Sequence, residues 1–222
     1  RSWGRYLGNR YKEFPNIIWL IGGDTNPFTY SVGEKVEQVV AGIKEYDTIH
    51  LITAHTGPGT SAQDIWGGRT WLNLNTIYHY GIGELISMAQ REYTRPNALP
   101  LFMMETAYER EHDSTPASLR QPAYSGPLWG GTCGSFLGNC PLWSFGFDDG
   151  WCVAANWKDQ LNSTGSIEFG YFASFMRSRR FWLLVPDYSH TVMTAGYGSG
   201  PTLATTARAS DGSSIIAYIP TQ

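Results

Sequence analysis

The chain has 222 residues and a formal net charge of −3, and its sixteen basic residues form no long run. It therefore lacks the clustered Lys and Arg that nucleic-acid binding requires, and no stretch approaches the 18 apolar residues of a membrane span. Aromatic residues make up 14% of the chain, and part of this surplus is a candidate for stacking on sugar rings. The alternative is that large rings simply fill a large core.

Helical and strand patterns alternate along most of the chain. Helical spacing of apolar residues predicts helices at 1–14, 32–46, 83–93, the beginning of 122–129, and 167–180. Near-continuous apolar runs are typical of parallel strands that are buried on both faces, and they predict strands at 17–21, 49–54, 71–77, 100–104 and 129–136. This alternation with short connections favours βαβ units with right-handed crossovers.

Two of the predicted strands end in a carboxylate. Asp24 follows the run that begins at Asn16, and Glu105 follows the run that begins at Leu99. An acid at the point where a parallel strand leaves the core lies at the carboxyl-terminal mouth of an α/β barrel, where such enzymes carry out their chemistry. Two such acids are the minimum needed to cleave a glycosidic bond. The alternative is that both acids merely begin surface loops.

Five strands are too few for a (β/α)8 TIM barrel, which needs eight strands and about 250 residues. Because the chain opens inside a predicted helix, we expect it to be the C-terminal part of such a barrel. Near the end of the chain, two short runs at 205–209 and 215–219 surround Asp211-Gly212 and predict a hairpin. This all-β style indicates the beginning of a second domain.

Three cysteines, Cys133, Cys140 and Cys152, fall within twenty residues of a loop rich in glycine and aromatics. Their spacing does not match a zinc site. One disulfide, either Cys133–Cys140 or Cys140–Cys152, would suit an exported protein and leave one thiol free. Three reduced, buried thiols are the alternative.

Four segments resemble the apiosidase-like glycoside hydrolases, family 140 and its relatives. They are Asn16-Ile17-Ile18-Trp19-Leu20-Ile21-Gly22-Gly23-Asp24, Met104-Glu105-Thr106-Ala107-Tyr108-Glu109, Cys133-Gly134-Ser135-Phe136-Leu137-Gly138-Asn139 and Trp182-Leu183-Leu184-Val185-Pro186-Asp187. The resemblance implies a TIM barrel, here about strands 4–8, followed by a small β-sandwich. It therefore implies that residues 1–187 belong to the catalytic barrel and that residues 188–222 are a linker and the first hairpin of the sandwich.

The same resemblance implies that Asp24 and Glu105 are the catalytic pair, which agrees with their position at strand ends. We expect Asp24 to be the general acid/base and Glu105 the nucleophile of a retaining enzyme, with carboxyl groups about 5–5.5 Å apart. Tyr108 is expected to orient Glu105, and Glu109 to be a structural partner of an arginine such as Arg120.

Further residues are candidates for binding substrate. His55 ends a predicted strand, and its imidazole can hydrogen-bond a sugar hydroxyl or simply cap the strand. Asn75 is a candidate from the next strand, and Tyr108 is a candidate from the segment that follows Glu105. Trp143 and Trp151 are candidates from the cysteine loop. That loop departs from the family pattern, which leaves the identity of the sugar open.

The sequence therefore predicts a glycosidase that cleaves a plant-type or microbial polysaccharide and needs no metal and no organic cofactor. The expected partners are the carbohydrate and the missing N-terminal barrel segment, from the same or another chain, with no nucleic acid and no membrane. We expect the protein to be secreted or periplasmic. A carbohydrate-binding barrel without turnover is the alternative, although it would need neither carboxylate. A metal-dependent hydrolase ranks last because only His55 is well placed as a ligand.

Overall fold

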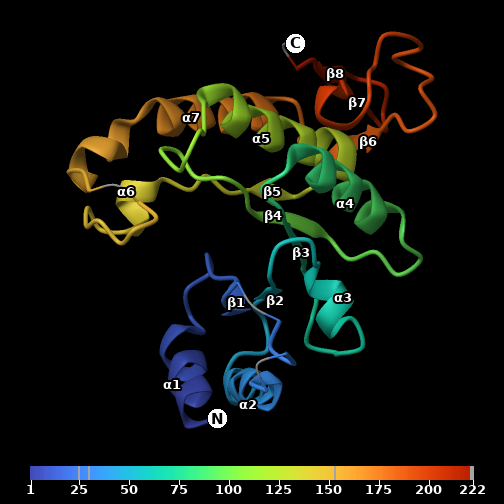
Figure 1. The fold of residues 1–222 in the computed structure, drawn as a ribbon. Coiled ribbons are helices and arrows are strands. Elements are labelled where there is room, and N and C mark those ends of the chain that lie inside the picture. Colours follow the sequence, from blue (N-terminus) through green and yellow to red (C-terminus); the bar gives the residue numbers. More distant parts are fainter. Residues whose placement is uncertain (25, 30, 153, 221–222) are drawn as a thin grey trace. The chain divides into compact units, whose positions relative to one another are not determined.

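A computed structural model describes residues 1–24, 26–29, 31–152 and 154–220 of the chain (Figure 1). These residues form two compact units, Arg1–Tyr78 and His79–Gln222. In both units helices alternate with strands, and each unit contains a pair of neighbouring parallel strands.

The first unit alternates helix and strand. Its elements are α1 (Ser2–Tyr11), β1 (Trp19–Gly22), α2 (Gly33–Lys44), β2 (Ile52–His55), α3 (Ala62–Trp66) and β3 (Asn75–Tyr78). β1 pairs with β2 in parallel, with Trp19 opposite Ile52 and Gly22 opposite His55. The Thr76 hydroxyl donates to the Ala54 carbonyl at 2.6 Å, which ties β3 to β2. Asp24 therefore follows the carboxyl end of β1, and His55 is the last residue of the neighbouring strand β2.

Helices α1 and α2 pack closely because glycines lie where they cross. A Cβ atom on Gly4 would meet the backbone carbonyl of Val39, and one on Gly42 would meet the carbonyl of Arg1. At neither position is there room for a methyl group, and closely packed protein interiors resist the shifts that would create it. These two glycines therefore set the distance between the helices.

The second unit contains more elements. They are α4 (Ile82–Thr94), β4 (Leu101–Glu105), α5 (Pro116–Gly130), β5 (Gly134–Ser135), α6 (Cys140–Trp143), η1 (Trp157–Asn162), α7 (Thr164–Ser178), η2 (Phe181–Leu183), β6 (Leu184–Pro186), η3 (Gly200–Thr202), β7 (Thr205–Ala209) and β8 (Ile215–Tyr218). β4 pairs with β5 in parallel, with Phe102 opposite Gly134. β6, β7 and β8 form an antiparallel sheet.

The antiparallel sheet shares its core with the two long helices of the same unit. Phe172 and Met176 of α7 and Leu128 of α5 belong to one buried cluster with Ala207 of β7 and Ile216 of β8. The predicted hairpin is confirmed, and β6 adds a third strand to it. This three-stranded layout is not shown to be a β-sandwich, and the domain boundary at 187/188 stays a prediction.

The mixed α/β class and the parallel pairing are confirmed, but two of the strands were placed incorrectly. The strand expected at 129–136 is wrong at Trp129, which is buried at the end of α5, and only Gly134–Ser135 is extended. Gly131 ends α5 with φ +58°, a left-handed conformation that suits glycine. The strand expected at 71–77 begins only at Asn75. Within the described residues, no helix is both long and apolar enough to cross a membrane.

Candidate active site

Asp24 lies two residues beyond the carboxyl end of β1. Its backbone has φ 42°, in the left-handed region, which aspartate tolerates better than most residues but which still costs energy. Its side chain is exposed, and its backbone carbonyl lies against Gly57, where a Cβ atom would be 3.8 Å away. The first unit thus holds a carboxylate in a sharp turn at the end of a parallel strand, as the sequence predicts.

His55 is the last residue of β2 and lies beside the turn that carries Asp24. It is paired in register with Gly22, whose missing side chain leaves room for the His55 carbonyl. The imidazole contacts the ring of Tyr78 edge-on, with 5.8 Å between ring centroids. Asp24, His55 and Tyr78 therefore lie at the carboxyl ends of β1, β2 and β3, and Tyr78 is a residue that the sequence analysis missed.

Asn75 is placed differently from the other candidates of the first unit. It begins β3 and is fully buried, and its side-chain oxygen accepts hydrogen bonds from the backbone N–H groups of Gln63 (2.9 Å) and Thr76 (3.0 Å). These contacts give Asn75 a structural role in joining α3 to β3. A contact between Asn75 and substrate stays a prediction.

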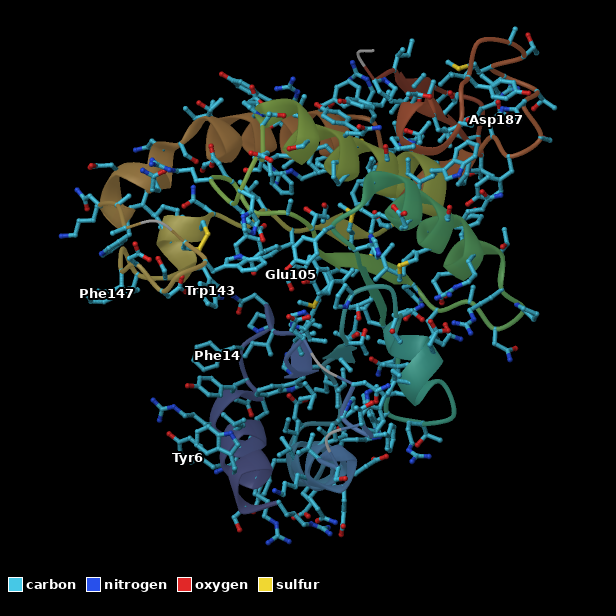
Figure 2. The ribbon with its side chains drawn as sticks, in the orientation of Figure 1. Tyr6, Phe14, Glu105, Trp143, Phe147 and Asp187 are labelled. Carbon is cyan, nitrogen blue, oxygen red and sulfur yellow. A yellow bond between two sulfur atoms is a disulfide. The ribbon has the colours of Figure 1, made fainter. Side chains whose placement is uncertain are left out.

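Glu105 is the last residue of β4 in the second unit, where the sequence places it (Figure 2). It is 7% exposed. Burial, followed by a hydrogen bond to the Glu105 side chain, raises the pKa of Tyr108 far above its usual value. The phenol therefore stays protonated and donates to the Glu105 carboxylate, which fixes the direction of that carboxylate. The predicted orienting role of Tyr108 has this contact as its basis.

The loop that follows Glu105 is held in place by two other carboxylates. Glu111 accepts a hydrogen bond from the Tyr108 backbone N–H at 2.6 Å. Glu109 accepts from the Asn139 amide at 3.0 Å, from the Ser163 hydroxyl and from the Gly165 backbone N–H at 2.9 Å. Glu109 is thus a structural residue, as expected.

The expected partner of Glu109 is wrong, however. Arg120 pairs with Glu168 of α7 at 2.6 Å instead. Glu109 lies at the amino end of α7, where unpaired backbone N–H groups and the helix dipole favour a carboxylate. Those donors meet the negative charge without any arginine.

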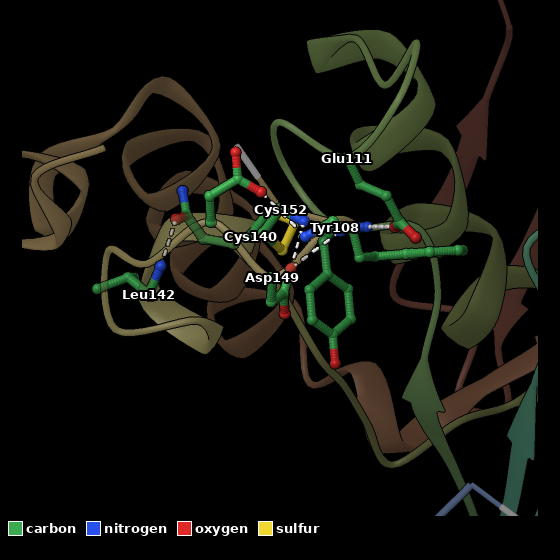
Figure 3. The surroundings of a disulfide bond; sticks show 10 residues. Tyr108, Glu111, Cys140, Leu142, Asp149 and Cys152 are labelled. Carbon is green, nitrogen blue, oxygen red and sulfur yellow. Dashed lines mark hydrogen bonds between the residues drawn. A yellow bond between two sulfur atoms is a disulfide. The ribbon is translucent and has the colours of Figure 1, made fainter. Parts of the chain in front are cut away.

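A disulfide joins Cys140 to Cys152, which is one of the two expected pairings, and Cys133 is free. The Cys140 backbone N–H donates to the Glu109 carbonyl at 2.9 Å, so the disulfide is attached to the loop that follows Glu105. Within the closed loop, Asp149 accepts from the backbone N–H of Cys152 at 2.7 Å (Figure 3). The loop is therefore anchored at both of its cysteines.

Trp143 and Trp151, the two tryptophans expected to bind substrate, both belong to this disulfide-closed loop. They are 62% and 50% exposed. Trp151 packs edge-on against His112, with 4.6 Å between ring centroids. Trp143 lies on α6, and Figure 2 shows it on the same loop as Phe147. Both indoles are therefore exposed to solvent in this unit, where a ligand can contact them.

The candidate residues divide between the two units. Asp24, His55 and Asn75 belong to the first, whereas Glu105, Tyr108, Trp143 and Trp151 belong to the second. That the two carboxylates face each other stays a prediction, as do the individual binding roles. Among the described residues, no three His, Cys, Asp or Glu side chains are grouped as a metal site.

A known family matches most of this chain. Residues 1–183 match the model of the apiosidase-like catalytic domain. The chain belongs to the apiosidase-like family. Among curated proteins, none is significantly similar to it in sequence.

Solved structures that are similar to this apiosidase-like chain include two glycoside hydrolases. One is described as a glycoside hydrolase and has a TM-score of 0.79, with 26% identity over 93% of this chain and 52% of its own. The other is a glycoside hydrolase family 5 protein from Bacteroides vulgatus ATCC 8482, also with a TM-score of 0.79, at 24% identity. This second match covers 93% of the present chain and 50% of the Bacteroides vulgatus protein. The present chain therefore spans about half the length of both structures.

Proposed function

We propose that the protein containing this chain is a retaining glycoside hydrolase, in which Glu105 is the nucleophile and Asp24 the general acid/base. The observation that carries the proposal is the setting of Glu105. Its carboxylate is buried at the carboxyl end of a parallel strand and accepts a hydrogen bond from Tyr108, within a chain of the apiosidase-like family.

Each residue has a defined task in the proposed reaction. Asp24 donates its proton to the glycosidic oxygen while Glu105 attacks the anomeric carbon, so that the C–O bond to the leaving group breaks and a glycosyl ester forms. Asp24 then takes a proton from water, and the water oxygen replaces the Glu105 carboxylate. The Tyr108 hydroxyl keeps one carboxylate oxygen aimed at the sugar during both steps.

The two carboxylates must face each other across one cleft for this chemistry. We propose that both units belong to one (β/α)8 barrel, as about its strands 4–8, and that an N-terminal barrel segment completes it. The similarity to glycoside hydrolases about twice as long supports this arrangement. The antiparallel sheet β6–β8 would then begin a C-terminal β-sandwich domain.

The family name suggests an apiose-containing plant polysaccharide as substrate, and we extend the proposal to other plant-type or microbial polysaccharides. His55, Asn75, Trp143 and Trp151 are the proposed sugar-binding residues. The Cys140–Cys152 disulfide suits an oxidising compartment and supports a secreted or periplasmic protein.

The experiment is a screen of 4-nitrophenyl glycosides and plant polysaccharide digests with the full-length protein, followed by NMR of the anomeric product. Retained configuration is expected. Asp24→Asn should slow substrates with poor leaving groups far more than activated aryl glycosides, because only the former need protonation. Inverted product would refute the nucleophilic role of Glu105, and binding of the digests without any turnover would favour the non-catalytic carbohydrate-binding protein.

A further inference from the structure

Two hydrogen bonds fix the main chain of Tyr108, the residue whose hydroxyl bonds to the Glu105 side chain. The Tyr108 backbone N–H donates to the Glu111 carboxylate at 2.6 Å, and the Glu111 backbone N–H donates to the Tyr108 carbonyl at 3.1 Å. Glu111 is 4% exposed, and a hydrogen bond to a carboxylate is stronger in such a shielded position than in water. With the main chain fixed, the side-chain torsions of Tyr108 alone decide where its hydroxyl lies.

The ring of Tyr108 lies directly against the backbone of Gly138. A Cβ atom on Gly138 would be within 2.6 Å of three atoms of this ring, whereas carbon atoms in contact are normally about 3.5–4.0 Å apart. The Gly138 backbone is outside the left-handed region, so alanine could adopt its conformation. Glycine is thus required here by the Tyr108 ring and not by the backbone. Phe136 also packs against the ring, with 6.1 Å between ring centroids.

The segment that contains Gly138 is itself attached to the loop that carries Tyr108. The Glu109 backbone N–H donates to the Gly138 carbonyl at 2.9 Å, and the Cys140 backbone N–H donates to the Glu109 carbonyl at 2.9 Å. These two bonds form a short parallel bridge, and Cys140 is further bonded to Cys152 (Figure 3). Gly138 therefore cannot move away from the ring without breaking the bridge.

We propose that Gly138 and Glu111 are positioning residues of the glycosidase, which act on Glu105 through Tyr108. Glu111 fixes the main chain of Tyr108, and Gly138 leaves room for its ring, so that the phenol oxygen meets the carboxylate in one orientation. Their role rests on the proposed function and adds to it two residues that act without contact to the reacting atoms. Such positioning matters because a displacement of about 1 Å can reduce the rate of an enzyme about a hundredfold.

The test is the kcat and KM of Gly138→Ala in the full-length protein, with the best 4-nitrophenyl glycoside of the screen as substrate. The added methyl group displaces the Tyr108 ring, and Glu105 loses the hydrogen bond that orients it. We expect kcat to fall at least about tenfold while KM stays within about threefold, as for the loss of a hydrogen bond to a charged group. Substrates with poor leaving groups should be slowed equally, because proton donation by Asp24 is unchanged.

A double-mutant cycle with Tyr108→Phe separates positioning from a loss of stability. Tyr108→Phe keeps the ring, and hence the clash that Gly138→Ala introduces, but removes the hydroxyl. In the Tyr108→Phe background, Gly138→Ala should therefore lower the urea midpoint as before but reduce kcat by less than about threefold further. Equal losses of kcat in the two backgrounds would overturn the proposal, because Gly138 would then act independently of the Tyr108 hydroxyl.

Gly130→Ala is the matched control for crowding. It places a methyl group 2.6 Å from the Cβ atom of Ala89, between helices α5 and α4 of the same unit. It should therefore lower the urea midpoint but leave kcat within about threefold of the wild type. A folded Gly138→Ala protein with near-normal kcat, or a Gly130→Ala protein with an equal loss of kcat, would overturn the role of Gly138.

Two variants of Glu111 test the other half of the proposal. Glu111→Ala removes the acceptor of the Tyr108 N–H and should lower kcat about as much as Gly138→Ala. Glu111→Gln keeps an acceptor oxygen and should restore most of that loss. If Gly138→Ala does not fold, these two variants in the same two Tyr108 backgrounds decide the outcome, and an unchanged kcat in Glu111→Ala overturns the proposal.

Fluorine NMR reports the position of Tyr108 without any turnover. In protein labelled with 3-fluorotyrosine, the Tyr108 resonance is the one that is missing from Tyr108→Phe. Glu105→Gln removes the neighbouring charge and should shift this resonance in the wild type, but far less in Gly138→Ala. If the resonance responds in this way and the wild type hydrolyses no glycoside, the proposed function fails while the positioning stands. If the wild type is active and the resonance responds equally in both backgrounds, only the positioning fails.

Discussion

Replacing Glu109 with alanine should destabilise the second unit severely, although Glu109 has no proposed part in the chemistry. The carboxylate accepts hydrogen bonds from Asn139, Ser163 and Gly165, and so joins the loop after β4 to the amino end of α7. A hydrogen bond to a charged group is worth about 1.5–3 kcal/mol net. Because the three bonds share one carboxylate and water partly replaces them, we expect the free energy of unfolding to fall by about 3 kcal/mol in total.

Glu168→Ala is the matched control, since it removes a glutamate of the same unit that pairs only with Arg120 among the hydrogen bonds and ion pairs described. Both partners of that pair are partly exposed, and such pairs are worth about 0–1 kcal/mol. Urea unfolding followed by tryptophan fluorescence measures both variants. A loss below about 1 kcal/mol for Glu109→Ala, or equal losses in the two variants, would refute the role assigned to Glu109.

Three further predictions concern stability. Cys152→Ser should lower the free energy of unfolding by on the order of 3 kcal/mol, since it opens a loop with a sequence separation of 12, and a reducing agent should bring the wild type to the same urea midpoint. Gly4→Ala should cost about 1–3 kcal/mol because its methyl group would meet the Val39 carbonyl, whereas Gly170→Ala, with nothing within 4 Å, should raise the melting temperature slightly. Burial alone would raise the pKa of Asp187, but hydrogen bonds from backbone N–H groups hold this pKa below its usual value. The ionised Asp187 carboxylate therefore adds to the free energy of unfolding above about pH 4, and this stabilisation is lost as the pH falls further. Asp187→Asn should therefore be less stable than wild type at pH 7, with a difference that shrinks towards pH 2 in thermal unfolding.

The sequence reveals those features that depend on local pattern. The apolar run from Leu101 to Met104 predicts a buried parallel strand with Glu105 at its end because both faces of that strand must be covered. The Asp211-Gly212 turn likewise predicts the hairpin of β7 and β8. In each case a few neighbouring residues determine the outcome.

Other features depend on contacts between distant segments, which local pattern does not report. An apolar stretch around Trp129 fits a buried helix as well as a strand, and α5 extends through it because Gly131 ends the helix. The Glu109 carboxylate accepts its hydrogen bonds from residues 30 to 56 positions away, at Asn139, Ser163 and Gly165. The sequence around Glu109 therefore does not reveal these donors. The contact between Tyr108 and Glu105, in contrast, is predicted from the sequence, because the two residues are only three positions apart.

The central claim is that Glu105 is the nucleophile of a glycosidase, and the kcat/KM of Glu105→Gln in the full-length protein tests it most directly. Glu168→Gln serves as the control, and circular dichroism verifies that both variants are folded. The account predicts a loss of at least about a thousandfold for Glu105→Gln with little change for Glu168→Gln, because the amide is not a nucleophile. A folded Glu105→Gln protein that retains activity within about tenfold of wild type would contradict the account.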